Sequence, residues 1–210
     1  MVLFDYSREP RSDIAFVDMK SFYASCECIA LGLDPLKTSL CVMSRIENSA
    51  GLILAATPLF KKNFGSQNVI RSYNLPFDVH TRKFNYAAAR KQGLPITADY
   101  VRFIEDAAQK TLLVPPRMNY YIQKNMEIQK IFQDFAAPDD IFPYSIDEGF
   151  LDLTSSINYF IPDQTLDRRT KLDLLAARIQ QAIWKKTGIY ASIGLSNAHP
   201  LLAKLALDIE

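Results

Sequence analysis

The order of apolar runs and amphipathic helices along the chain is the feature that most constrains its fold. An apolar run at 14–17 indicates a buried strand, and apolar side chains in steps of three and four from Arg117 onward indicate a long helix. Two strands, a second amphipathic helix and a further strand follow, at 142–145, 149–153, 172–183 and 190–195. This β-α-β-β-α-β order predicts an α+β fold built on a ferredoxin-like sheet.

A second, smaller subdomain is expected between the first strand and the long helix. The predicted division assigns 1–20 and 82–210 to the sheet domain and 21–81 to the inserted subdomain. Segment 67–92 is polar and interrupted by Pro76, which predicts mostly loop and short strand. Helices are expected at 21–31, 58–64 and 97–110, a β-hairpin at 40–43 and 52–55, and a last helix from Pro200 to Glu210.

Length and composition restrict the class of protein without identifying it. The 210 residues, 49% of them hydrophobic, suffice for one sizeable core with a small subdomain. No apolar stretch reaches the roughly 18 residues that span a bilayer, and the polar N-terminus lacks the features of a secretory signal. We therefore expect a cytoplasmic protein with no membrane partner and with its three cysteines as reduced thiols. The net charge of +1 gives no support for nucleic-acid binding.

Three carboxylates are expected to gather at one edge of the predicted sheet. Asp18 ends the first strand, and Asp147 and Glu148 lie at the turn of the central hairpin, which neighbours that strand in this topology. Like charges this close raise each other's pKa unless a cation neutralises them. Oxygen ligands of this kind suit Mg²⁺ or Mn²⁺, and two such ions about 3.5–4 Å apart can hold both oxygens of a phosphoryl displacement. The pattern predicts a two-metal phosphoryl-transfer site.

Simpler explanations exist for each carboxylate taken alone. The pair Asp147 and Glu148 is typical of a solvated tight turn, and Asp18 is typical of a helix cap. The combination of all three in this topology is more specific, but several nucleotidyl transferases and nucleotide cyclases have it in common.

Three motifs resemble those of the Y-family translesion DNA polymerases. The first is FVDMKSFYASCE, 16–27, and the second is SIDEGFLD, 145–152. A third, at 192–197 and 202–204, resembles the segment that closes the palm of these enzymes. The FYASCE wording is closest to the UmuC-like bacterial branch. The resemblance extends from Ile14 to the end of the chain and implies a catalytic palm with an inserted fingers subdomain.

The resemblance implies a metal-binding role for four residues. Asp18, Asp147 and Glu148 would be side-chain ligands of two Mg²⁺ ions, with Mn²⁺ as the substitute, and the backbone carbonyl of Met19 would assist. These ions would assist attack of a primer 3′-hydroxyl on the α-phosphate of a deoxynucleoside triphosphate, directed by a template.

A nucleotide-binding role is implied for four further residues. Tyr23, beside Phe22, would lie beneath the sugar and exclude a 2′-hydroxyl, whereas Lys62 and Lys204 would contact the triphosphate. The simpler explanations are a core aromatic for Tyr23 and a solvated helix face for either lysine. Many family members have a tyrosine where this chain has Leu59, and its absence fits the UmuC-like branch.

Family members continue into a thumb and a little finger that hold the primer-template duplex, whereas this sequence stops at Glu210. We therefore expect the palm and fingers of an error-prone polymerase of DNA repair and the SOS response, as a fragment or a truncated protein. A sliding clamp or a recombinase filament would bind the missing part. Two alternatives stay open: an inactive DNA- or protein-interaction module, and a nucleotide cyclase with a related palm.

Overall fold

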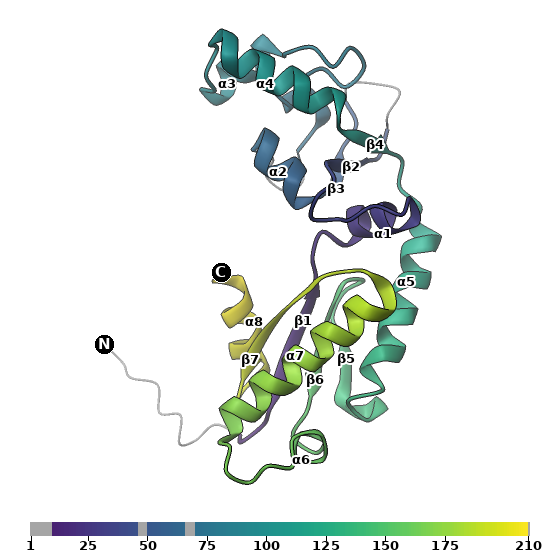
Figure 1. Cartoon of the computed structure of the whole chain (residues 1–210), viewed down its shortest axis with the longest axis vertical. Helices are drawn as coiled ribbons and strands as arrows, with labels where there is room; N and C mark the ends of the chain where they lie inside the picture. Colours follow the sequence, from purple (N-terminus) through teal and green to yellow (C-terminus); the bar gives the residue numbers. More distant parts are fainter. Residues whose placement is uncertain (1–9, 46–49, 66–69, 210) are drawn as a thin grey trace, which may run out of the picture. The chain divides into compact units, whose positions relative to one another are not determined.

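The computed structural model describes residues 10–45, 50–65 and 70–209, which form two compact units (Figure 1). We call the first the sheet unit, which combines the N-terminal residues up to Lys20 with the chain from Asn119 onward. The second is the insert unit, Ser21–Met118. Each unit is described by itself.

The sheet unit contains a four-stranded antiparallel sheet. Its strand order is β5-β6-β1-β7, and each neighbouring pair is antiparallel. Along the chain, the insert unit follows β1, helix α5 (Met118–Phe132) then precedes β5, and α7 (Arg168–Thr187) lies between β6 and β7. The strands are β1 (Ile14–Met19), β5 (Ile141–Pro143), β6 (Glu148–Asp152) and β7 (Ala191–Ser196). Order and connections together confirm the predicted β-α-β-β-α-β fold of ferredoxin-like type.

The two faces of this sheet are distinguished by the alternation along β1. Ile14 and Phe16 pack with Phe150 and with Ala203 of α8 (Pro200–Asp208). Ala15 and Val17, which point to the opposite face, are fully buried. Asp18 has the same parity as Phe16, so its side chain belongs to the face that α8 covers.

Helix α8 approaches the sheet closely because Gly194 in β7 has no side chain. A Cβ at this position would clash with the carbonyl oxygen of Ala203 and would lie 2.9 Å from the backbone nitrogen of Leu207. Glycine is therefore required by the close approach of a second backbone.

The insert unit contains a three-stranded sheet of order β3-β2-β4. The expected hairpin is present, since β2 (Leu40–Met43) and β3 (Ile53–Ala56) are antiparallel, and β4 (Leu112–Val114) pairs in parallel with β2. In α2, Thr57 caps the N-terminus and Gly65 takes a left-handed conformation at the C-terminus. The helices are α1 (Phe22–Ala30), α2 (Pro58–Phe64), α3 (Tyr86–Gln92) and α4 (Ala98–Gln109).

The predicted end of the inserted subdomain at residue 81 differs from the structure, in which the compact unit continues to Met118. The reason is a common core, in which Phe84 and Ile104 pack in the same cluster as Phe60 and Phe77. Helix α3, in a segment expected to be mostly loop, is capped by the Asn85 side chain. The last helix ends at Asp208, and its expected end at Glu210 lies outside the described residues.

The remaining elements are short. They are helix α6 (Ile157–Phe160) and the 3₁₀ turns Ser72–Asn74 and Pro138–Asp140. All three cysteines lie in the described part of the chain, where they are buried and form no disulfide, and burial raises the pKa of Cys41 to about 12. No helix in the described part of the chain is long and apolar enough to cross a membrane.

Candidate functional site

Asp18 and Glu148 face each other across two strands of the sheet unit. They are Cα partners in the antiparallel register of β1 and β6. Side chains at paired positions point to the same face, with Cβ atoms roughly 4.5–5.5 Å apart. Glu148 is the first residue of β6, so it lies in the strand and not in the turn where the sequence placed it.

Asp147 is held beside this pair by the backbone. The backbone N–H of Met19 donates to the carbonyl oxygen of Asp147 at 3.0 Å, which extends the pairing of β1 one residue beyond β6. The Asp147 side chain accepts a hydrogen bond from the Ser145 hydroxyl at 2.8 Å. The structure therefore brings the three predicted carboxylates to one end of the sheet.

The electrostatics of Asp18 reflect this crowding. Burial raises its pKa from 3.8 to about 7, and the charges of Asp147 and Glu148 add to the increase. Burial also raises the pKa of Asp147, although the hydrogen bond from Ser145 opposes the change. A carboxylate cluster that is stabilised by protonation is one that a cation would also stabilise.

Lys204 is the cation that the structure places at this cluster. Its Nζ lies 3.3 Å from Oε1 of Glu148 and 3.6 Å from Oδ1 of Asp208. The same ammonium lies 4.4 Å from the centre of the Phe16 ring, within the range of cation–π attraction. These carboxylates raise the pKa of Lys204 although burial lowers it, so the side chain stays charged beside the acids.

Two polar side chains at the turn before Asp147 were not predicted from the sequence. Asn125 in α5 donates through Nδ2 to the carbonyl oxygen of Ile146 at 2.7 Å. Ser145, as noted, donates to Asp147. The available signal was the position of Asn125, a polar residue on the mostly apolar face of a helix.

The other predicted nucleotide-binding residues, Phe22, Tyr23 and Lys62, lie in the insert unit. The Phe22 and Tyr23 rings are adjacent at the start of α1, with centroids 5.9 Å apart. Phe22 is buried, whereas Tyr23 is half-buried and packs against a cluster that contains Leu40 and Val42. Lys62 is exposed in the last turn of α2.

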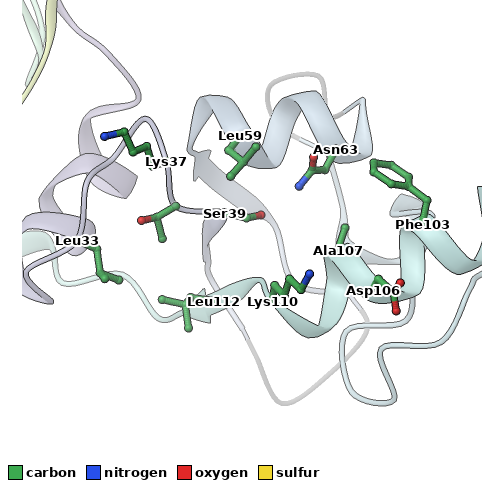
Figure 2. Close-up of a pocket in the computed structure, with 11 residues that line it drawn as sticks. Leu33, Lys37, Ser39, Leu59, Asn63, Phe103, Asp106, Ala107, Lys110 and Leu112 are labelled. Atoms are coloured by element: carbon green, nitrogen blue, oxygen red, sulfur yellow. The ribbon is translucent and has the colours of Figure 1, made fainter.

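The insert unit also contains a pocket of about 650 Å³ between α2 and α4 (Figure 2). Its wall is largely apolar, with Leu59 from α2 and Phe103 from α4, and Lys62 does not line it. Three charged side chains, Lys37, Asp106 and Lys110, are among the lining residues that Figure 2 shows. None of the residues predicted to bind nucleotide or metal contributes to this pocket.

The donor set at the sheet edge fits a hard divalent cation in its chemistry. It consists of carboxylate oxygens whose mutual repulsion a Mg²⁺ ion would remove. In the described part of the chain, however, no group of three or more His, Cys, Asp and Glu side chains has the geometry of a metal site. A cation would therefore require side-chain rotation, including release of Glu148 from Lys204.

Comparison with known proteins identifies the family. Residues 81–208 match the model of the impB/mucB/samB family. The chain is 31% identical over 208 residues to UvrX of Bacillus subtilis (strain 168), whose name refers to UV-damage repair. The alignment covers 99% of this chain and 39% of UvrX. It is also 32% identical over 143 residues to YozK of the same organism, which is named as a DNA repair protein homolog. That alignment covers 68% of this chain and 98% of YozK.

Among solved structures, a Y-family DNA polymerase chimera, Dbh-Dpo4(243-245)-Dbh, matches with a TM-score of 0.63 and 20% identity. The match covers 94% of this chain and 46% of the chimera, and it supports the fold. The chain thus spans less than half the length of UvrX and of this polymerase. By its family model and its fold, the chain belongs to the impB/mucB/samB family, with the palm and fingers architecture of Y-family polymerases.

Proposed function

We propose that this chain is the catalytic palm and fingers of a DNA-directed DNA polymerase that acts in lesion bypass in the cytoplasm. The observation that carries the proposal is the register that pairs Asp18 with Glu148, beside Asp147. The substrates would be a primer-template duplex and deoxynucleoside triphosphates. A sliding clamp or a recombinase filament would be a further partner.

Two Mg²⁺ ions, when bound by Asp18, Asp147, Glu148 and the carbonyl oxygen of Met19, would activate the primer 3′-hydroxyl and neutralise the triphosphate. The protein's own groups orient the reactants. The half-buried Asp18 is neutral at low pH and must lose its proton before it can serve as a ligand.

The lysines have a separate role in this proposal. Release of Glu148 to a cation would free the Lys204 ammonium to contact a phosphate oxygen. Lys62, exposed on α2, would contact the same triphosphate. Tyr23 would exclude ribonucleotides because its ring would clash with a 2′-hydroxyl group on the sugar.

The direct test is extension of a labelled primer on a template with deoxynucleotides and Mg²⁺, comparing wild type with Asp147→Asn. We expect extension to be lost in the variant, and full extension by the variant would contradict the proposed site. Mn²⁺ binding, followed by electron paramagnetic resonance, tests the cluster independently of DNA binding. Loss of high-affinity Mn²⁺ in Asp18→Asn is expected, and unchanged binding would contradict the assignment.

A further inference from the structure

A pocket of about 350 Å³ opens at the end of the sheet unit where β1 begins. Figure 1 shows α6 and the first turn of α7 at this end of the sheet. Asp13 lines the pocket and precedes β1, whereas Asp18 lies near the far end of the same strand. Five residues of extended chain correspond to roughly 16 Å, so the pocket is distinct from the carboxylate cluster.

One cation of this pocket is neutralised by a neighbour. Arg168 binds the fully buried Asp13 with two hydrogen bonds, Nε to Oδ1 at 3.2 Å and Nη2 to Oδ2 at 2.8 Å. Asn197 donates to the same carboxylate at 2.6 Å. This bidentate pair is complete in itself and ties the start of β1 to α7.

A second cation, Lys171, has no such carboxylate partner among the residues that the structure describes. Its residue is only 7% exposed, and its Nζ donates to the neutral Oδ1 of Asn158 at 2.7 Å. Across residues 10–45, 50–65 and 70–209, Lys171 forms no ion pair, although Asp163 is close enough for its charge to interact with the ammonium. A buried ammonium is ordinarily paired with a carboxylate or another anion.

Arg11 adds to the same pocket a second positive charge that no described carboxylate neutralises. Its side chain is exposed and forms no ion pair with the described residues. Asn158 binds Lys171 through its oxygen, which leaves the Nδ2 group able to donate into the pocket. The pocket therefore combines two positive charges and an amide donor in a space larger than a small anion.

We propose that this pocket binds a small phosphate-type dianion, namely inorganic phosphate, pyrophosphate or the phosphate of a monoester, through Lys171, Arg11 and Asn158. Two cations, neither of them in an ion pair with a described carboxylate, match the charge of a dianion. A compact ammonium with a planar guanidinium is a combination that recognises phosphate oxygens. Asp13 does not oppose the ligand, because Arg168 neutralises it.

The test titrates the chain with phosphate, pyrophosphate and a nucleoside monophosphate at constant ionic strength, with calorimetry and thermal unfolding as readouts. Lys171→Met retains the apolar stem and removes the buried charge, and we expect it to weaken binding at least about tenfold, or 1.4 kcal/mol. Arg11→Ala, at an exposed position, should weaken binding without affecting folding. The matched controls are the exposed Lys91→Met and Arg102→Ala, which should bind as wild type does.

The proposal is overturned if Lys171→Met and Arg11→Ala bind these anions as wild type does, or if the two control variants lose affinity equally. It is also overturned if the wild-type chain shows no binding at millimolar concentrations, or if chloride at the same ionic strength stabilises the chain as much as phosphate. The proposal is likewise overturned if anion binding is lost only in Lys204 or Lys62 variants, because the anion would then bind at the proposed nucleotide site.

Discussion

The side-chain amide of Asn125 donates to the carbonyl oxygen of Ile146, one residue before Asp147. The bond crosses from the middle of α5 to the turn between β5 and β6, so a helix fixes the backbone that presents one of the candidate metal ligands. The hydroxyl of Ser145 completes the arrangement from within the turn. The position of Asp147 thus depends on an uncharged side chain in α5.

Replacing Asn125 with alanine is therefore expected to impair catalysis through the turn. The Ile146 carbonyl would lose its partner, at a cost of about 1 kcal/mol in the free energy of unfolding. Looser placement of Asp147 should raise the Mg²⁺ concentration needed for half-maximal primer extension. Asn119→Ala, an exposed asparagine in the first turns of the same helix, is the matched control. Equal Mg²⁺ dependence in both variants would show that Asn125 does not position Asp147.

Titration of Asp18 should make the free energy of unfolding depend on pH. Its folded-state pKa of about 7 exceeds the ordinary value of 3.8, so the folded chain binds more protons than the unfolded chain between these values. Without metal, the free energy of unfolding should fall as pH rises from about 4 to about 7. Asp18 is partly exposed, so solvent screening limits the effect to about 1–2 kcal/mol.

Urea unfolding at several pH values checks this expectation. Asp18→Asn should remove most of the decline and be more stable than wild type at pH 8, whereas the exposed Asp173→Asn should retain it. Added Mg²⁺ should stabilise wild type more at pH 8 than at pH 5, because ligands must be deprotonated. An identical pH profile for wild type and Asp18→Asn would contradict the assigned coupling.

The sequence predicted the sheet unit well because its signals are local. Apolar runs and steps of three and four along α5 and α7 define the elements, and topology then places β1 beside β6. The extent of the insert unit was missed because the packing of Phe77 and Phe84 with Phe60 depends on long-range contacts. The pairing of Lys204 with Glu148 likewise depends on how closely α8 approaches the sheet, which no local pattern encodes.

Gly194→Ala tests that close approach. A methyl group would clash with the backbone of α8 and displace Lys204 from the carboxylates. Overpacking of this kind costs about 1–3 kcal/mol, and primer extension should fall with it. Gly149→Ala is the control for stability, because its Cβ would lie no closer than 3.4 Å to any neighbour. Equal melting temperatures for the two variants would show that α8 tolerates the added methyl group.

Substitution can test whether Lys62 and Lys204 contact the triphosphate. Lys62→Met and Lys204→Met should each raise the KM for deoxynucleotides by roughly tenfold or more, the loss expected for a hydrogen bond to a charged group. Lys61→Met, next to Lys62 on α2, is the matched control for charge. Steady-state insertion of a single nucleotide measures all three variants. A larger rise in KM for Lys61→Met than for Lys62→Met would transfer the phosphate contact to Lys61.

Tyr23 is expected to determine the choice of sugar. Its ring packs against a cluster that includes Leu40, so Tyr23→Ala will also lower stability, and activity alone would not separate the two effects. The ratio of ribonucleotide to deoxynucleotide insertion, measured on one preparation, cancels any loss of folded protein. We expect this ratio to rise about tenfold or more in Tyr23→Ala, or at least 1.4 kcal/mol of discrimination. The control is Tyr86→Ala, at an exposed tyrosine of α3, which should leave the ratio unchanged. An equal ratio in both variants would show that Tyr23 contributes to packing and not to the choice of sugar.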